Sequence, residues 1–185
     1  LYLMEKLPVY DSYVKNGEYE KSPLFTCFEP YFTELAGKTW GIIGLGNIGR
    51  KVAEIAKVFD CRVIFYSASG KNDTTDFERV DFDTLLAESD VLSLHCPLTD
   101  RTEKIMNEES FAKMKNTAIL INVARGPVVN NADLYTALTQ EEIAGAGLDV
   151  VEKEPIAVDN PLNKIKDRIQ FFQILKIRVA VLTYG

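Results

Sequence analysis

Short apolar runs alternate with segments of helical spacing from residue 38 to about residue 150. Five of the runs are predicted strands, at residues 39–45, 62–66, 90–95, 118–123 and 144–150. Several of them are apolar without alternation, as expected for strands of a parallel sheet that is covered on both faces. Four intervening segments are predicted helices, at residues 47–59, 83–88, 108–114 and 131–139. Strand alternating with helix predicts a doubly wound parallel α/β sheet of the Rossmann type.

A leader and a tail flank this pattern. The leader, residues 1–35, contains a candidate amphipathic helix at residues 3–15, which Pro8 limits. Because the first residue is Leu1, we expect the chain to begin inside a longer reading frame, or translation to start at Met4. The tail, residues 166–185, is apolar and β-prone, which makes it an aggregation liability if it stays unpaired. We therefore expect one domain at residues 36–165 between a leader and a divergent tail.

Composition and charge narrow the class of protein. The 185 residues are 46% hydrophobic and 26% charged, which suits a single globular domain. The net charge of −6 argues against nucleic acid or an anionic membrane as a partner, because both need a basic face. No apolar run approaches the roughly 20 residues of a membrane span. Cys27, Cys61 and Cys96 form no C-x-x-C pair, which predicts no disulfide framework, no zinc site and a reduced, cytoplasmic setting.

The segment IIGLGNIGR at residues 42–50 carries the spacing G-x-G-x-x-G at Gly44, Gly46 and Gly49. The first glycine allows a tight strand-to-helix turn, the second lets the backbone approach a pyrophosphate, and the third lets the helix pack close to the strand. The helix that opens at Asn47 would point free N–H groups at the phosphates. Because the motif joins a predicted strand to a predicted helix, it indicates a dinucleotide-binding turn rather than a turn without a ligand.

The residue at the end of the second strand bears on the choice of cofactor. A site for NAD usually has Asp or Glu here, about 20 residues after the glycines, to hold the ribose 2′-hydroxyl. In this sequence Ser67 takes that place, and the nearest following acid is Asp73. A serine does not repel a 2′-phosphate, and Lys71 offers a charge to pair with one. Alternatively, Ser67 hydrogen-bonds the ribose and Lys71 is solvated, so NAD is expected and NADP stays open.

Four segments occur in a fixed order, namely LAGKTWGIIGLGNIG at 35–49, SLHCPLT at 93–99, LINVARG at 120–126 and AGAGLDVVEKEP at 144–155. Together they resemble the NAD(P)-binding domain of the D-isomer-specific 2-hydroxyacid dehydrogenase family, over roughly residues 1–165. The resemblance implies an oxidoreductase that acts on the CH–OH group of D-2-hydroxy acids, with reduction of 2-keto acids by hydride transfer. It also implies a homodimer, with this domain and a leader like residues 1–35 forming the subunit interface.

The resemblance further implies contacts with the cofactor. Asn47 and Ile48 would present backbone to the pyrophosphate. Cys96 and Pro97 would line the adenosine side, with Thr102 nearby. On the nicotinamide side the implied contacts are Val123, Ala124 and Asp149, and Asp149 would hold the carboxamide.

The implied catalytic residues are Arg125 and Glu154. The guanidinium fork of Arg125 would hold the carboxylate and the carbonyl oxygen of a 2-keto acid at once. Glu154 would orient a catalytic histidine, which gives a proton to the alkoxide that hydride transfer forms. Taken alone, Arg125 would more often be a surface charge, Glu154 a loop residue and Asp149 a turn cap.

The sequence departs from the family at the catalytic histidine. The only histidine, His95, lies in the cofactor-side motif, and no Thr-Pro-His occurs beyond Glu154. The segments that form the family's substrate domain are also missing from this sequence. We therefore expect the chain alone to have no useful dehydrogenase activity, since general acid catalysis contributes about 10²–10⁴-fold. The alternative is a non-catalytic dinucleotide-binding or dimerisation module, although the retained Arg125 and Glu154 favour recent descent from an enzyme.

Overall fold

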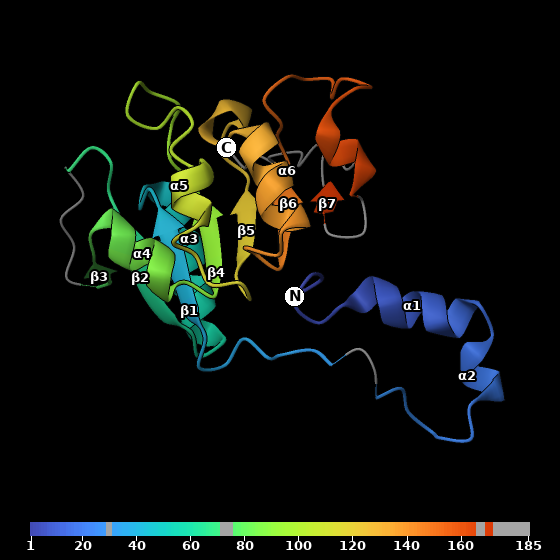
Figure 1. Ribbon diagram of the computed structural model, residues 1–185. Coiled ribbons are helices and arrows are strands. Elements are labelled where there is room, and N and C mark those ends of the chain that lie inside the picture. The colour runs from blue at the N-terminus through green and yellow to red at the C-terminus, as the bar shows by residue number, and fades with distance from the viewer. Residues whose placement is uncertain (29–30, 71–75, 166–168, 172–185) are drawn as a thin grey trace, which may run out of the picture.

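The computed structural model describes residues 1–28, 31–70, 76–165 and 169–171, and the body of the molecule is one parallel sheet (Figure 1). Its strands lie in the order β3-β2-β1-β4-β5-β6-β7, and each neighbouring pair is parallel. The order of the first six is that of a doubly wound dinucleotide-binding sheet, so the predicted fold class is confirmed. In chain order the strands are β1 (Thr39–Ile43), β2 (Arg62–Tyr66), β3 (Glu78–Arg79), β4 (Val91–Leu94), β5 (Ile119–Asn122), β6 (Gly145–Leu148) and β7 (Ile169–Phe171).

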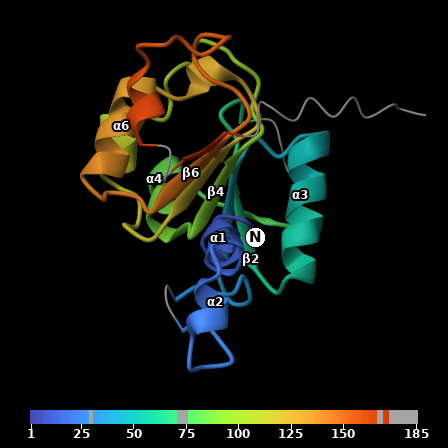
Figure 2. The same cartoon turned by 90° about the vertical axis from the view of Figure 1, so that its right-hand side faces the viewer.

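Helices cover both faces of the sheet. Figure 2 shows α3 (Asn47–Val58) on one face, with α4 (Phe82–Glu88) and α6 (Asn131–Thr139) on the other. The short α5 (Glu108–Phe111) packs against α4 and α6, and 3-10 turns occur at Gly126–Val128 and Pro161–Lys164. No helix in the described part of the chain is long and apolar enough to cross a membrane.

The hydrophobic core divides into two clusters, one on each side of the sheet. On the α3 side, Ile42 and Phe65 from the strands pack with Ala53 and Ala56 of α3. The larger cluster lies under α4, α5 and α6 and includes Leu86, Phe111, Leu134 and strand residues that face them. Because both faces are buried, the strands need no polar alternation, which is why their continuous apolar runs predicted a parallel sheet.

Every strand and helix predicted for residues 36–165 occurs. β2 and α6 match the predicted ranges 62–66 and 131–139, α4 begins one residue earlier than predicted, and the other elements are shorter than predicted. The run at 39–45 ends as a strand at Ile43, because Gly44 turns the chain with φ +95°. The helix predicted at 108–114 is the α-helix α5 only as far as Phe111. Two strands were missed. β3 is two exposed polar residues with no apolar signal, and β7 lies in the predicted β-prone tail, where Ile169 is buried against the core.

The leader extends away from the sheet as an arm (Figure 1). Its helix α1 (Leu7–Lys15) begins later than the predicted residue 3, with Pro8 in the first turn, where the missing N–H costs nothing. A second helix, α2 (Glu18–Lys21), follows, and neither helix buries a residue. Met4, before α1, is the leader's contact with the core cluster on the α3 side, alongside Leu35.

The turn from β1 to α3 depends on three glycines that do different work. A Cβ on Gly44 would lie 2.8 Å from the backbone of Cys96, and a Cβ on Gly49 would lie 2.2 Å from the carbonyl oxygen of Gly44. A Cβ on Gly46 would meet nothing within 4 Å. The first and third glycines therefore hold the backbone in close contact, while the second leaves open space at the start of α3.

This difference predicts a matched pair of stability effects. Gly49→Ala should lower the free energy of unfolding by about 1–3 kcal/mol, because the new methyl group forces backbone apart. Gly46→Ala should change it by no more than about 0.5 kcal/mol, because its site is open and its φ of −80° suits any residue. Urea denaturation of both variants measures the two effects, and equal midpoints for them would contradict the packing described.

Candidate functional site

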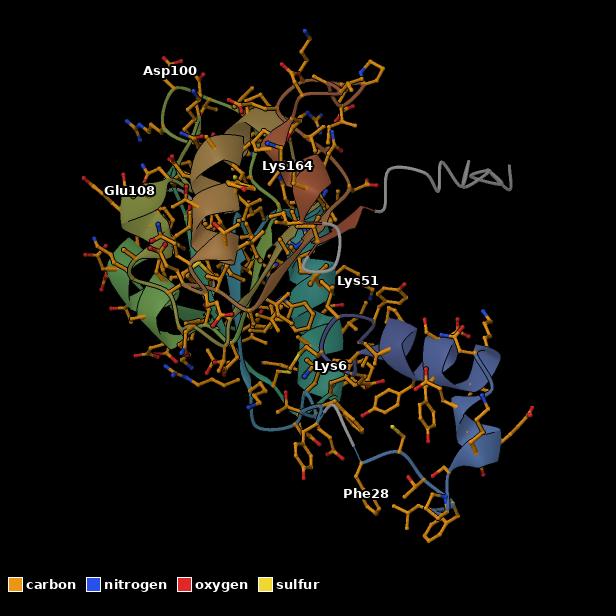
Figure 3. All side chains as sticks on the ribbon, turned by 45° about the vertical axis from the view of Figure 1, so that its right-hand side comes forward. Lys6, Phe28, Lys51, Asp100, Glu108 and Lys164 are labelled. Atoms are coloured by element: carbon orange, nitrogen blue, oxygen red, sulfur yellow. The ribbon has the colours of Figure 1, made fainter. Side chains whose placement is uncertain are left out.

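A cavity of about 570 Å³ opens at the carboxyl ends of β1, β2 and β4. Its wall consists of Gly44 and Gly46 after β1, residues 67–69 after β2, and residues 95–97 and 99–102 after β4. The helix after β1 covers one face and the helix after β4 packs on the other, so the cavity lies at the topological switch point where such sheets bind ligands. Asp100, on its wall, lies at the end of the molecule away from Phe28 and the leader (Figure 3).

The N-terminus of α3 borders this cavity without a side-chain cap. Asp81, Asn107 and Asn130 each cap the start of α4, α5 or α6 with a side-chain oxygen, whereas α3 has only Gly46 in that position. Asn47 and Ile48 are exposed, and the apolar Ile48 is 70% exposed. The first N–H groups of α3 are thus left to bind an anion, and the open space at Gly46 lets that anion approach.

The loop after β4 forms a stiff wall. Thr102 is 2% exposed; its hydroxyl donates to the carbonyl of Pro97 at 2.6 Å and accepts from the N–H of Thr99 at 2.8 Å. Burial raises the pKa of the Cys96 thiol to about 11, which keeps it protonated and apolar at neutral pH. Cys61 and Cys96 are buried, and Cys27 is half-buried.

His95 lies on the same wall of the cavity, next to Cys96 and Pro97. Its Nε2 lies 3.1 Å from the Ser93 hydroxyl, which also accepts from the indole N–H of Trp40 at 2.9 Å. Burial lowers the pKa of His95, so the ring is neutral near pH 7. Its Nδ1 is buried without a hydrogen-bond partner among the described residues. These features suit a wall residue rather than an acid that supplies protons.

Ser67 occupies the end of β2 and is 5% exposed. Its hydroxyl lies 3.3 Å from that of Ser69, and its carbonyl accepts from the N–H of Gly70 at 3.1 Å, which closes a turn. Arg101 reaches across the cavity to this turn and donates to the carbonyl of Ala68 at 3.4 Å. Lys71, a predicted partner for a 2′-phosphate, lies outside the described residues.

The other predicted residues follow β5 and β6 along the same edge of the sheet. They do not line the cavity, but β4 and β5 are neighbours with Leu94 opposite Asn122, so they continue the edge on which it lies. The N–H of Asp149 donates to the carbonyl of Asn122 at 2.9 Å, which extends the pairing of β5 with β6 by one bond. These residues are Val123, Ala124, Arg125, Asp149 and Glu154, and all but Ala124 are exposed.

Asn122 shapes the loop that carries Arg125. Its buried side chain accepts from the N–H of Ala124 and donates to the carbonyl of Arg125, both at 3.1 Å. The next residue, Gly126, packs so closely that a Cβ would lie 1.8 Å from the carbonyl oxygen of Val151. The loop of Arg125 is therefore seated directly on the segment that leads to Glu154.

The side chains of Arg125 and Glu154 both extend into solvent. Arg125 donates to the carbonyl of Ala124 at 2.8 Å, and Glu154 accepts from the N–H of Val151 at 3.3 Å. The arrangement can present a cation and a carboxylate beside a ligand on the edge of the sheet.

Sequence reasoning missed several residues of the site. Arg101 and Ser69 line the cavity, and Asn122 and Gly126 position the loop of Arg125. The strand-end rule could have found Arg101 and Ser69, since both follow strands whose carboxyl ends were predicted to meet. No group of three histidine, cysteine or acidic side chains within the described residues could hold a metal ion.

Comparison with known proteins identifies the family. The model of the D-isomer specific 2-hydroxyacid dehydrogenase NAD binding domain matches residues 1–170. A glyoxylate reductase from Thermofilum pendens is 43% identical over 161 residues, which cover 83% of this chain and 46% of the relative. The chain thus spans about half the length of the curated relatives that it matches.

Solved structures agree. An acyclic imino acid reductase in complex with NADPH and D-Arg has a TM-score of 0.81 at 34% identity, covering 92% of this chain and 52% of that one. A D-lactate dehydrogenase from Aquifex aeolicus, complexed with NAD and lactic acid, has a TM-score of 0.79 at 33% identity, covering 91% and 54%. The chain therefore belongs to the D-isomer specific 2-hydroxyacid dehydrogenase family and corresponds to its NAD-binding domain.

Proposed function

We propose that this chain binds a nicotinamide dinucleotide in the cavity at the end of β1 and serves an oxidoreductase that reduces 2-keto acids to D-2-hydroxy acids. The proposal rests on several features that lie along one edge of the sheet, at the carboxyl ends of its strands. An uncapped helix N-terminus, an open glycine position and a cavity lie beside a loop that presents arginine. A dinucleotide lying along this edge would run from the cavity toward Arg125.

The chain's own residues would hold the cofactor at successive points. The N–H groups at Asn47 and Ile48 bind the pyrophosphate, with Gly44, Gly46 and Gly49 giving it access. Cys96 and Pro97 line the adenosine side on a loop that Thr102 ties together, and Ser67 faces the ribose. Val123 and Ala124 lie along the nicotinamide ribose, and Asp149 accepts from the carboxamide. The bound cofactor supplies the hydride, and the protein supplies position and electrostatics.

Arg125 would bind the 2-keto acid, because a guanidinium fork matches a carboxylate beside a carbonyl. Glu154 would orient and charge a histidine that gives the proton. The one histidine in this sequence, His95, is held neutral on the cofactor side. We therefore propose that this chain by itself binds cofactor and keto acid without turning them over.

A keto acid titration tests the role of Arg125. With NADH or NADPH saturating, glyoxylate should bind the chain, and Arg125→Gln should weaken that binding about tenfold or more, because a charge-assisted pair is lost. Isothermal calorimetry measures the affinity. Lys113→Gln is the matched control, since Lys113 pairs with Asp83 on α4, away from this edge. Equal affinity of Arg125→Gln and the unchanged chain would refute the proposed role.

The alternative function, a dimerisation module, is favoured by the apolar surface of the leader. Phe25 is 89% exposed, Tyr31 75% and Val14 58%, on an arm that packs little on its own sheet. Exposed apolar surface of this kind marks an association site. We propose that a second copy of the chain covers this surface. One protein would then both bind the dinucleotide and form a dimer.

Light scattering tests this assembly. The chain should have a mass near twice 20.8 kDa, and the double variant Val14→Ser with Phe25→Ser should shift it toward a monomer, because the buried apolar area is lost. Cofactor affinity should not change. A monomeric mass for the unchanged chain at micromolar concentration would contradict the proposal.

We further propose a cytoplasmic location, which is supported by three cysteines that remain free thiols. Fractionation of cells that express the intact protein would show it in the cytoplasm, and recovery outside the cytoplasm would count against this location.

A further inference from the structure

We propose that Lys104 is a positioning residue for the keto acid site. Through Glu152 it holds the segment after β6, which carries Glu154, against the loop after β5, which carries Arg125. The inference rests on the proposed binding of a keto acid at Arg125 and adds a residue that acts through the loops around that site.

Arg125 and Glu154 stand on different loops, so their separation depends on contacts between those loops. Arg125 follows β5 and Glu154 follows β6. Their own side-chain bonds, to the carbonyl of Ala124 and the N–H of Val151, stay within each loop. The close packing of Gly126 on the backbone of Val151 does join the two loops. A second contact between them comes from the loop after β4.

The loop after β4 runs alongside the segment that follows Arg125. The N–H of Lys104 donates to the carbonyl of Pro127 at 2.8 Å. The N–H of Met106 donates to the carbonyl of Val128 at 3.2 Å, and both of these residues are buried. Because this pairing is shielded from water, the backbone of Lys104 is fixed to the loop of Arg125.

The side chain of Lys104 extends from this fixed backbone to the segment after β6. Its Nζ lies 3.5 Å from Oε1 of Glu152. The lysine side chain is 50% exposed and that of Glu152 is 32% exposed, so the ion pair is partly shielded from water. Lys104 thus contacts the loop of Arg125 with its backbone and the segment of Glu154 with its side chain.

The backbone conformation of Lys104 points to a use for this side chain. Its φ of +48° lies in the left-handed region, which glycine adopts freely and a residue with a Cβ adopts under strain. Strained residues of this kind occur preferentially at functional sites. A glycine would suit the backbone better, so the contribution of the lysine lies in its ammonium group.

The ion pair is expected to affect binding more than folding. A half-exposed pair adds little to the free energy of unfolding. However, Gly126 packs on the backbone of both Val151 and Glu152, so movement of that segment also shifts the adjacent Arg125. A guanidinium fork that must match two oxygens of a keto acid is sensitive to such a shift.

A keto acid titration of matched variants tests the inference by isothermal calorimetry. With NADH saturating, Lys104→Gly and Glu152→Gln should each weaken glyoxylate binding about threefold, which is within the range of a partly exposed ion pair. The double variant should lose about as much as either single variant, because both remove the same contact. Lys104→Arg, which keeps the cation, should bind glyoxylate as tightly as the unchanged chain.

Two further measurements separate positioning from a general loss of structure. The affinity for NADH and the urea midpoint of Lys104→Gly should equal those of the unchanged chain. Lys113→Gln is the matched control for the loss of a surface lysine, since its partner Asp83 lies on α4. A parallel fall in NADH affinity or in the urea midpoint of Lys104→Gly would overturn the positioning role.

The outcomes also separate this inference from the proposed function. Unchanged glyoxylate affinity in Lys104→Gly overturns the inference and leaves keto acid binding intact. So does a double variant whose loss of binding free energy is the sum of the two single losses. Absence of glyoxylate binding by the unchanged, NADH-bound chain overturns the proposed role of Arg125, and the inference falls with it.

Discussion

The contact between the backbones of Gly44 and Gly49 is the constraint on which the site depends. It fixes the start of α3 against the end of β1 at a distance that no side chain allows, while Gly44 itself lies against Cys96. Together these two contacts bring the ends of β1 and β4 close to each other and direct the N–H groups of α3 toward the gap between them. The cavity exists because Gly46, between these two glycines, adds nothing to fill it.

The part of the sheet edge that follows β5 and β6 is held in place by other contacts. Asn122 is buried at the end of β5 and uses both ends of its amide to shape the loop to Arg125, and Gly126 seats that loop on Val151. A buried amide with both groups bonded is rigid, because leaving either group unpaired would be costly. Arg125 can therefore be presented to solvent from a fixed backbone, which is what a residue that positions a substrate requires.

The order of strands and helices could be predicted from the sequence because each element carries its own local signal. The strands after residue 38 are apolar runs long enough to be recognised in the sequence. The glycine motif locates the turn, because close backbone contacts there leave no room for a side chain. β3 could not be found, since its two residues, Glu78 and Arg79, are polar and exposed and pair only because β2 is beside them. The start of α1 shifted to Leu7 because a proline is accepted in a first turn.

The site was predictable to a lesser degree, and the reason is physical. Residues that act through their backbone, such as Gly46, can be recognised in the sequence, because the motif requires glycine at their position. The strand-end rule would place Arg101 near the site, but its contact with Ala68 depends on how far the side chain extends across a cavity whose width no local pattern records. The importance of Asn122 likewise depends on its burial and on two bonds within a loop, and the sequence shows only a polar residue at a strand end.

Hydrogen exchange of the chain with and without NADPH would test the central claim most directly, because it locates the bound cofactor. Our account predicts slower exchange at residues 44–49, 67–70 and 95–102, which surround the cavity, with residues 1–28 of the leader unchanged. Saturable binding of the cofactor with protection confined to other segments would contradict the assignment of the cavity at the end of β1.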